Sequence, residues 1–203
     1  MKLYYSTGAC SLASNIALHE AGIAFDLVKV NGRDKTTTDG RNFNAINSKG
    51  YVPALELDSG EILTENVALL GYIADLAPDA HLAPPPGTMQ RYRLNEYLSF
   101  INSELHKSFT PIFHSSTEDT KTEFRHTAAK RLGWLEQDLG SKDYLLGDTF
   151  TVADAYLFTV LSWAGPARVD LTPFPNLQRF QQRVMTRPSV VAAMAAEGLK
   201  RKA

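Results

Sequence analysis

Hydrophobic and polar residues follow different periods in the two halves of the chain. In the first eighty residues, short apolar or alternating runs typical of strands are interleaved with segments in which apolar residues recur every three or four positions, as on one face of a helix. The turn at residues 58–60 is typical of a β-hairpin. In chain order the pattern predicts strand 2–5, helix 11–21, strand 24–30, short helix 42–47, strand 51–57, strand 61–64 and helix 67–76.

From residue 88 onward every periodic segment is helical. An apolar stripe along a long helix is formed by Leu94, Leu98, Ile101 and Leu105. Further helices are predicted at 118–139, 155–164, 176–186 and 189–198.

The two halves are separated by a proline-rich stretch at residues 81–87, which can continue neither a helix nor a central strand. Strand, helix and strand within the first thirty residues form a βαβ unit, whose strands run parallel. We therefore predict an α/β domain over residues 1–80, a linker at 81–87 and an all-helical domain over 88–203.

Net charge, cysteine count and the length of the apolar runs exclude several classes of partner and site. The net charge of −1 gives no reason to expect nucleic acid or an acidic membrane as a partner. One cysteine excludes an intramolecular disulfide and a multi-cysteine metal site. No run approaches the roughly 20 apolar residues of a membrane span, and no secretion signal is evident, so we expect a cytoplasmic protein. The basic residues 200–202 are expected to be solvated.

The single cysteine, Cys10, lies between the first predicted strand and the N-terminus of the first predicted helix. The positive end of a helix dipole favours anions and lowers the pKa of a thiol from about 8.5 towards neutrality. Cys10 is therefore either a reactive thiolate or an inert buried side chain with small apolar character.

Two further positions allow both a structural and a functional interpretation. Pro53 cannot donate to a strand ladder, so it marks a strand entry where backbone groups are left for a ligand, and its peptide bond is a candidate for the cis form. Glu65 and Asn66 precede a helix, where they either cap it or hold the ammonium and carboxylate groups of one small molecule.

The long helix of the second half carries a second stripe, made of small hydroxyl residues and one histidine. Ser99, Ser103, His106 and Thr110 form either the wall of a polar cleft or a solvated face. Farther on, Thr151 and Asp154 have the spacing of a capping box, which makes Asp154 structural rather than catalytic.

Taken together, the βαβ and ββα order, the Val52-Pro53 pair, the Glu65-Asn66 helix start, the proline linker and the helical second half resemble a cytosolic glutathione S-transferase. The segment from Tyr4 to Ser14, together with His106, is similar to the bacterial beta class. The resemblance covers the whole chain and implies a thioredoxin-like first domain.

This resemblance implies a glutathione site in the first domain. Pro53 would be the cis proline of the fold, and Val52 would pair its main chain with the cysteinyl part of glutathione, as an added strand does. Glu65 and Asn66 would hold the γ-glutamyl end, and Lys35 would lie near the glycyl carboxylate.

The resemblance also implies residues around the glutathione sulfur. Cys10 would lie beside it, and Ser11 could donate a hydrogen bond to it, with His106 as a further donor. Some residues of the second domain would reach glutathione in the partner subunit of a homodimer. The residues expected to line the cleft are Ser99, where the family commonly has asparagine, Ser103, Glu104 and His106.

We therefore expect a glutathione transferase that activates the thiolate of glutathione, its co-substrate, for attack on a small hydrophobic electrophile, without a metal. Two alternatives stay open. One is a glutathione-dependent thiol–disulfide oxidoreductase or reductive dehalogenase with Cys10 as the nucleophile. The other is a non-catalytic binding protein of the same fold.

Overall fold

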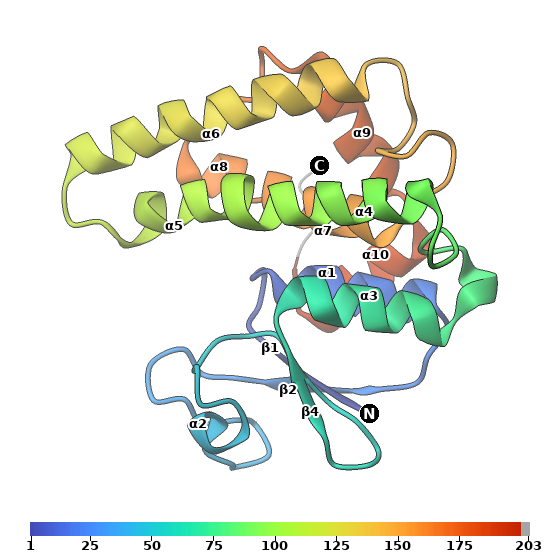
Figure 1. Cartoon of the computed structure of the whole chain (residues 1–203). Coiled ribbons are helices and arrows are strands. Elements are labelled where there is room, and N and C mark those ends of the chain that lie inside the picture. Colours follow the sequence, from blue (N-terminus) through green and yellow to red (C-terminus); the bar gives the residue numbers. More distant parts are fainter. Residues whose placement is uncertain (200–203) are drawn as a thin grey trace. The chain divides into compact units, whose positions relative to one another are not determined.

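In the computed structural model, which describes residues 1–199, the chain divides into two units (Figure 1). The first unit consists of Met1–Ala83 together with the segment that begins at Thr186, and the second is Pro84–Met185. The basic residues 200–202 lie outside the described residues.

A four-stranded mixed sheet forms the centre of the first unit, with strand order β2-β1-β3-β4. Strand β1 (Lys2–Tyr5) runs parallel to β2 (Asp26–Lys29) and antiparallel to β3 (Ala54–Glu56), which pairs antiparallel with β4 (Ile62–Thr64). The parallel βαβ unit and the hairpin predicted from the sequence are thereby confirmed, although β2, β3 and β4 are shorter than predicted.

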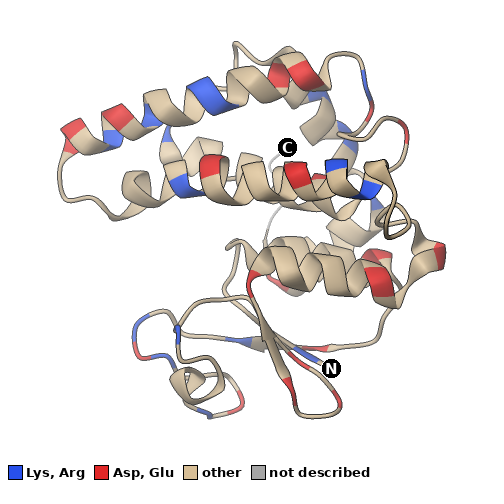
Figure 2. Cartoon of the chain, viewed as in Figure 1, with Lys and Arg blue, Asp and Glu red and all other residues tan. Residues whose placement is uncertain are grey.

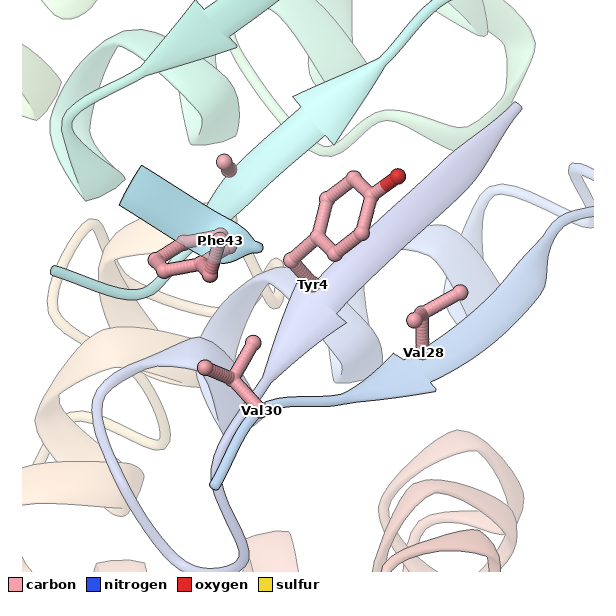
Figure 3. Close-up of a cluster of buried hydrophobic side chains, with 5 residues drawn as sticks. Tyr4, Val28, Val30 and Phe43 are labelled. Atoms are coloured by element: carbon pink, nitrogen blue, oxygen red, sulfur yellow. The ribbon is translucent and has the colours of Figure 1, made fainter. Parts of the chain in front are cut away.

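Helices cover both faces of this sheet (Figure 1). Because successive strand residues point to opposite faces, Tyr4 of β1 faces away from its neighbour Leu3, and both side chains are fully buried. Tyr4 packs with Val28, Val30 and Phe43 in one cluster, in which the Tyr4 and Phe43 ring centroids are 5.7 Å apart (Figure 3). The helices of this unit are α1 (Ser11–Glu20), α2 (Phe43–Ile46), the 3-10 helix Pro78–Ala80, α3 (Asn66–Leu76) and α10 (Pro188–Ala196).

The last helix, α10, belongs to the first unit and packs against α1. The Arg187 Nε atom donates to a Glu20 carboxylate oxygen at 3.3 Å, and the Ser189 hydroxyl donates to the same carboxylate. The sequence-based division had placed all of residues 88–203 in the helical domain. An amphipathic pattern shows that one helix face is buried, but it does not show which surface covers it.

The second unit is entirely helical in its regular structure. The predicted stripe of Leu94, Leu98, Ile101 and Leu105 is buried, and all ten residues of α7 are buried as well. Charges of both signs follow one another along α6 (Figure 2). Its helices are α4 (Met89–Phe100), the π-helical turn Ile101–His106, α5 (Lys107–His114), α6 (Glu118–Leu139), α7 (Val152–Leu161), α8 (Ala164–Ala167) and α9 (Pro175–Met185).

The capping box predicted at the start of α7 is present. The Asp154 carboxylate accepts hydrogen bonds from the Thr151 backbone N–H and hydroxyl, both at 2.8 Å, and from the Leu145 N–H, also at 2.8 Å. Burial raises the pKa of Asp154 to about 6, and these hydrogen bonds oppose the rise. Asp154 is therefore a structural residue that joins the preceding loop to α7.

Candidate functional site

Cys10 is the N-cap residue of α1, at the junction where the sequence placed it. The tight turn before it is closed by Ser11, whose fully buried hydroxyl donates to the Ser6 carbonyl and accepts from the Ser6 N–H, both at 3.3 Å. Since these contacts occupy Ser11, its hydroxyl supports the turn and would have to leave it to reach a ligand sulfur.

Backbone N–H groups in the first turn of α1 also form hydrogen bonds within the chain. The N–H groups of Leu12 and Ala13 donate to carbonyl oxygens of the same turn, at 3.0 and 3.1 Å. The dipole of α1 remains as the feature of this helix end that favours an anion next to Cys10. The N–H groups of Leu12 and Ala13 are therefore not available to a ligand anion.

The thiol of Cys10 lies against the segment that enters β3. Its Sγ atom donates to the Val52 carbonyl oxygen at 3.4 Å. The Val52–Pro53 peptide bond is cis, as expected, and Val52 precedes Ala54, the first paired residue of β3. The structure therefore places the thiol next to the main-chain group for which the family resemblance implies contact with the cysteinyl part of glutathione.

Asn66 lies at the start of α3, and a hydrogen bond from α1 orients its side-chain amide. The Ser14 hydroxyl of α1 donates to Asn66 Oδ1 at 2.7 Å, and both side chains are buried. With Oδ1 turned to Ser14, the Asn66 Nδ2 atom is buried and has no hydrogen-bond partner among residues 1–199. A buried amide donor without a partner is costly, so Nδ2 is suited to a ligand acceptor such as a carboxylate.

Glu65 does not cap α3, because its side chain makes no capping hydrogen bond. Instead its carboxylate is exposed and forms an ion pair with Lys49, with 2.7 Å between Nζ and Oε1. The backbone of Glu65 has φ 73°, in the left-handed region that costs a non-glycine residue free energy. The interpretation of Glu65 and Asn66 as a simple capping pair is therefore wrong.

Lys35 also lies in the left-handed region, with φ 58°. Its Nζ atom donates to the Gly50 carbonyl at 3.1 Å, which holds the ammonium over the loop that leads to Val52. Strained non-glycine backbone occurs preferentially at functional sites, and two of the sequence-predicted site residues show it.

In the second unit, the residues of the predicted hydroxyl stripe differ in their exposure to solvent. Ser99 and Ser103 are exposed, and the Ser103 hydroxyl donates to the Ser99 carbonyl at 2.9 Å. Glu104 is exposed as well and forms an ion pair with Arg131 of α6 at 2.7 Å.

His106 differs from these residues because it is partly buried. Its Nδ1 atom lies 2.7 Å from the Tyr156 hydroxyl, which itself donates to Asn102 Oδ1 at 3.0 Å. A hydroxyl has one proton to donate, so Nδ1 must carry the proton of the His106–Tyr156 bond, and Nε2 keeps a lone pair. Burial, followed by the nearby Lys107 charge, lowers the pKa of His106 to about 4.

This arrangement changes the expected role of His106. The sequence suggested a donor towards a thiolate, but a neutral imidazole with a lone pair on Nε2 is an acceptor.

Within residues 1–199, no group of three or more His, Cys, Asp or Glu side chains is arranged to hold a metal ion. None of the helices in the described part of the chain combines the length and apolar character needed to cross a membrane.

Comparison with known proteins agrees with this geometry. The family model of the glutathione S-transferase N-terminal domain matches residues 8–76, and the model of the C-terminal domain matches residues 97–188. The chain belongs to the glutathione S-transferase family. A relative of the family, glutathione S-transferase GstA of Escherichia coli O157:H7, is 45% identical over 201 residues, which cover 98% of this chain and 100% of the relative.

Solved glutathione S-transferase structures include similar bacterial members. The beta class enzyme of Sphingomonas chungbukensis is 49% identical, with a TM-score of 0.95 and coverage of 98% of this chain and 100% of that one. A sphingomonad glutathione S-transferase complexed with glutathione is 44% identical, with a TM-score of 0.95 and the same coverage. The resemblance to the beta class found in the sequence is thereby confirmed.

Several residues around the site were missed by sequence reasoning. Ser14 orients Asn66, Lys49 pairs with Glu65, and Tyr156 fixes the tautomer of His106. Of these, only Ser14 carried a usable signal, since it is a hydroxyl residue within a helix whose neighbouring positions are apolar or small.

Proposed function

We propose that this member of the family is a glutathione transferase that binds glutathione along the entry to β3 and the start of α3. The single observation that carries the proposal is the 3.4 Å contact between Cys10 Sγ and the Val52 carbonyl. A peptide that pairs its cysteinyl residue with the Val52 main chain would bring its own sulfur beside Cys10.

Charge complementarity supports the same orientation of the tripeptide. The exposed Glu65 carboxylate is suited to the γ-glutamyl ammonium, and the unpartnered Nδ2 of Asn66 is suited to the γ-glutamyl carboxylate. Lys35 supplies a cation for the glycyl carboxylate at the other end.

Activation of glutathione requires its thiol to lose a proton near neutral pH, and each pKa unit of stabilisation is worth about 1.4 kcal/mol. The dipole of α1 favours the thiolate, and Cys10 can donate a hydrogen bond to it. His106, neutral and with a lone pair on Nε2, is suited to accept a hydrogen bond from the thiol, while its lowered pKa makes it a weak base for the proton itself. The thiolate then forms a bond to an electrophilic carbon of a small hydrophobic substrate, and the leaving group departs with the electron pair of the bond that breaks.

The site assignment includes residues of the second unit. Ser99, Ser103 and Glu104 are proposed to line the glutathione site of a partner subunit in a homodimer, and the protein is proposed to act in the cytoplasm without a metal. Light scattering of the purified protein tests the dimer: a mass of one chain contradicts this part of the proposal.

Steady-state conjugation of glutathione to a chloronitrobenzene tests the transferase activity. We expect turnover that saturates with glutathione and that Asn66→Leu weakens mainly through the KM for glutathione. Absence of turnover with several halogenated and epoxide electrophiles, despite glutathione binding, would favour a non-catalytic binding protein.

A second function is favoured by the same Cys10 contact, because a sulfur beside Cys10 can exchange with it. In thiol–disulfide exchange, the Cys10 thiolate attacks a glutathione mixed disulfide, forms a bond to the glutathione sulfur and releases the other thiolate. A second glutathione thiolate then frees Cys10 and leaves as oxidised glutathione. Cys10→Ala separates the two functions: disulfide reduction that survives this change excludes the exchange mechanism.

A further inference from the structure

Glu197 has a buried carboxylate that plays no part in the proposed reaction. It follows α10, and only 4% of its surface is exposed. It also lies outside the ranges 8–76 and 97–188 matched by the two family models. A buried carboxylate needs hydrogen-bond donors around it, so its partners indicate what it does.

Both carboxylate oxygens of Glu197 bind donors near the start of α1. Oε2 accepts the Gly8 N–H at 2.8 Å, and Oε1 accepts from Asn15 Nδ2 at 3.1 Å. Asn15 Nδ2 also donates to the Ala193 carbonyl at 3.3 Å, which ties the same group to α10. Burial raises the pKa of Glu197, and the hydrogen bonds from Gly8 and Asn15 oppose the rise.

Gly8 lies two residues before Cys10, in the turn that carries the thiol. Its φ of 70° lies in the left-handed region that glycine adopts readily. The Gly8 N–H bond to Glu197 joins this turn to a residue 189 positions away.

We propose that Glu197 is a positioning residue that sets the place of the Cys10 thiol by holding the Gly8 amide from the end of α10. The role in catalysis rests on the proposed function, whereas the effect on the turn does not. Val52, Glu65 and Asn66 belong to other elements, so a loosened turn should affect the reacting sulfur more than the binding of glutathione.

Glu197→Ala tests this proposal, because it removes the carboxylate that accepts the Gly8 N–H, whereas a glutamine could keep that bond through its amide oxygen. In hydrogen exchange followed by NMR, we expect the Gly8 amide to lose about tenfold in protection, the factor that corresponds to one hydrogen bond. We expect kcat to fall by a similar factor while the KM for glutathione changes less than twofold.

Glu20→Gln is the matched control, since Glu20 also joins α1 to α10, through Arg187 and Ser189, but makes no bond to the turn. It should lower the melting temperature without changing Gly8 exchange or kcat. Should Glu197→Ala fail to fold, Glu197→Asp, whose side chain is one methylene shorter, must show the same order of effects.

Gly8 protection that is unchanged in the Glu197 variants, or reduced equally by Glu20→Gln, would overturn the proposal. So would a rise in the KM for glutathione with kcat unchanged. If the wild type shows no transferase activity, the proposed function fails, and Gly8 exchange still decides whether Glu197 holds the turn.

Discussion

Replacing Ser14 by alanine is expected to weaken glutathione binding although Ser14 itself need not touch the ligand. Ser14 is fully buried on α1, and its hydroxyl donates to Asn66 Oδ1 at 2.7 Å. That bond keeps Asn66 Nδ2, which has no hydrogen-bond partner in the described part of the chain, available for the γ-glutamyl carboxylate. Without the hydroxyl, Asn66 Oδ1 loses the donor that favours this orientation of the amide.

The magnitude follows from the oxygen left without a donor. A buried acceptor that loses its partner costs about 1–3 kcal/mol, and about 1.5 kcal/mol is reasonable for an amide that can partly turn away. The free variant relieves this cost by rotating Asn66, and binding must restore the original orientation. The same free energy therefore appears as lost affinity, and about 1.4 kcal/mol corresponds to a tenfold higher Kd. The free protein also loses the net stabilisation of the Ser14–Asn66 hydrogen bond, about 0.5–1.5 kcal/mol, so the melting temperature should fall by about 1–6 °C, at about 2–4 °C per kcal/mol for a chain of this size.

Isothermal titration of glutathione into wild type and Ser14→Ala measures the change in Kd, and thermal unfolding measures the change in stability. Ser189→Ala is the control, because it removes another buried serine hydroxyl of the first unit, bound to Glu20 rather than to Asn66. It should lose stability and keep the wild-type Kd. A Ser14→Ala variant that is less stable but binds glutathione as tightly as wild type would refute the reasoning about Asn66.

Three further outcomes are expected. Asp154→Ala removes the acceptor of two backbone N–H groups, so the free energy of urea unfolding should fall by about 2–4 kcal/mol; a loss below about 1 kcal/mol contradicts the capping role. Because the folded pKa of His106, about 4, lies below its ordinary 6.5, the stability it contributes is present above pH 6.5 and is lost as the pH falls towards 4. The free energy of unfolding should fall by about 3 kcal/mol over this pH range, and His106→Gln should abolish that pH dependence. An NMR titration of His106 with a midpoint near 6.5 would contradict the lowered pKa. Lys49→Ala, which frees the exposed Glu65 carboxylate, should change stability by less than about 1 kcal/mol in urea unfolding; a larger loss means that the ion pair is structural.

The sequence was most informative where local pattern and local chemistry coincide. Strand and helix order in residues 1–76, the hairpin turn and the capping box at Thr151 follow from neighbouring residues, whereas the cis Val52–Pro53 bond was implied by the family resemblance. Helix α6 was predicted with its observed bounds, Glu118–Leu139.

Features that depend on distant residues could not be predicted. The burial of α10 against α1, the Ser14 bond to Asn66 and the Glu197 bond to Gly8 join positions that no periodicity relates. The π-helical turn Ile101–His106 interrupts a continuous helical pattern, because apolar spacing at three and four residues does not distinguish a wider turn from an α-helical one.

The most direct test of the account compares glutathione with cysteinylglycine, the same peptide without its γ-glutamyl residue, by isothermal titration into the wild-type protein. We expect one glutathione per chain and binding of the dipeptide weaker by about 100-fold, because Glu65 and Asn66 lose two charge-assisted hydrogen bonds. No heat with glutathione, or equal affinity for the two peptides, would contradict the claim that the first unit holds the tripeptide by its γ-glutamyl end.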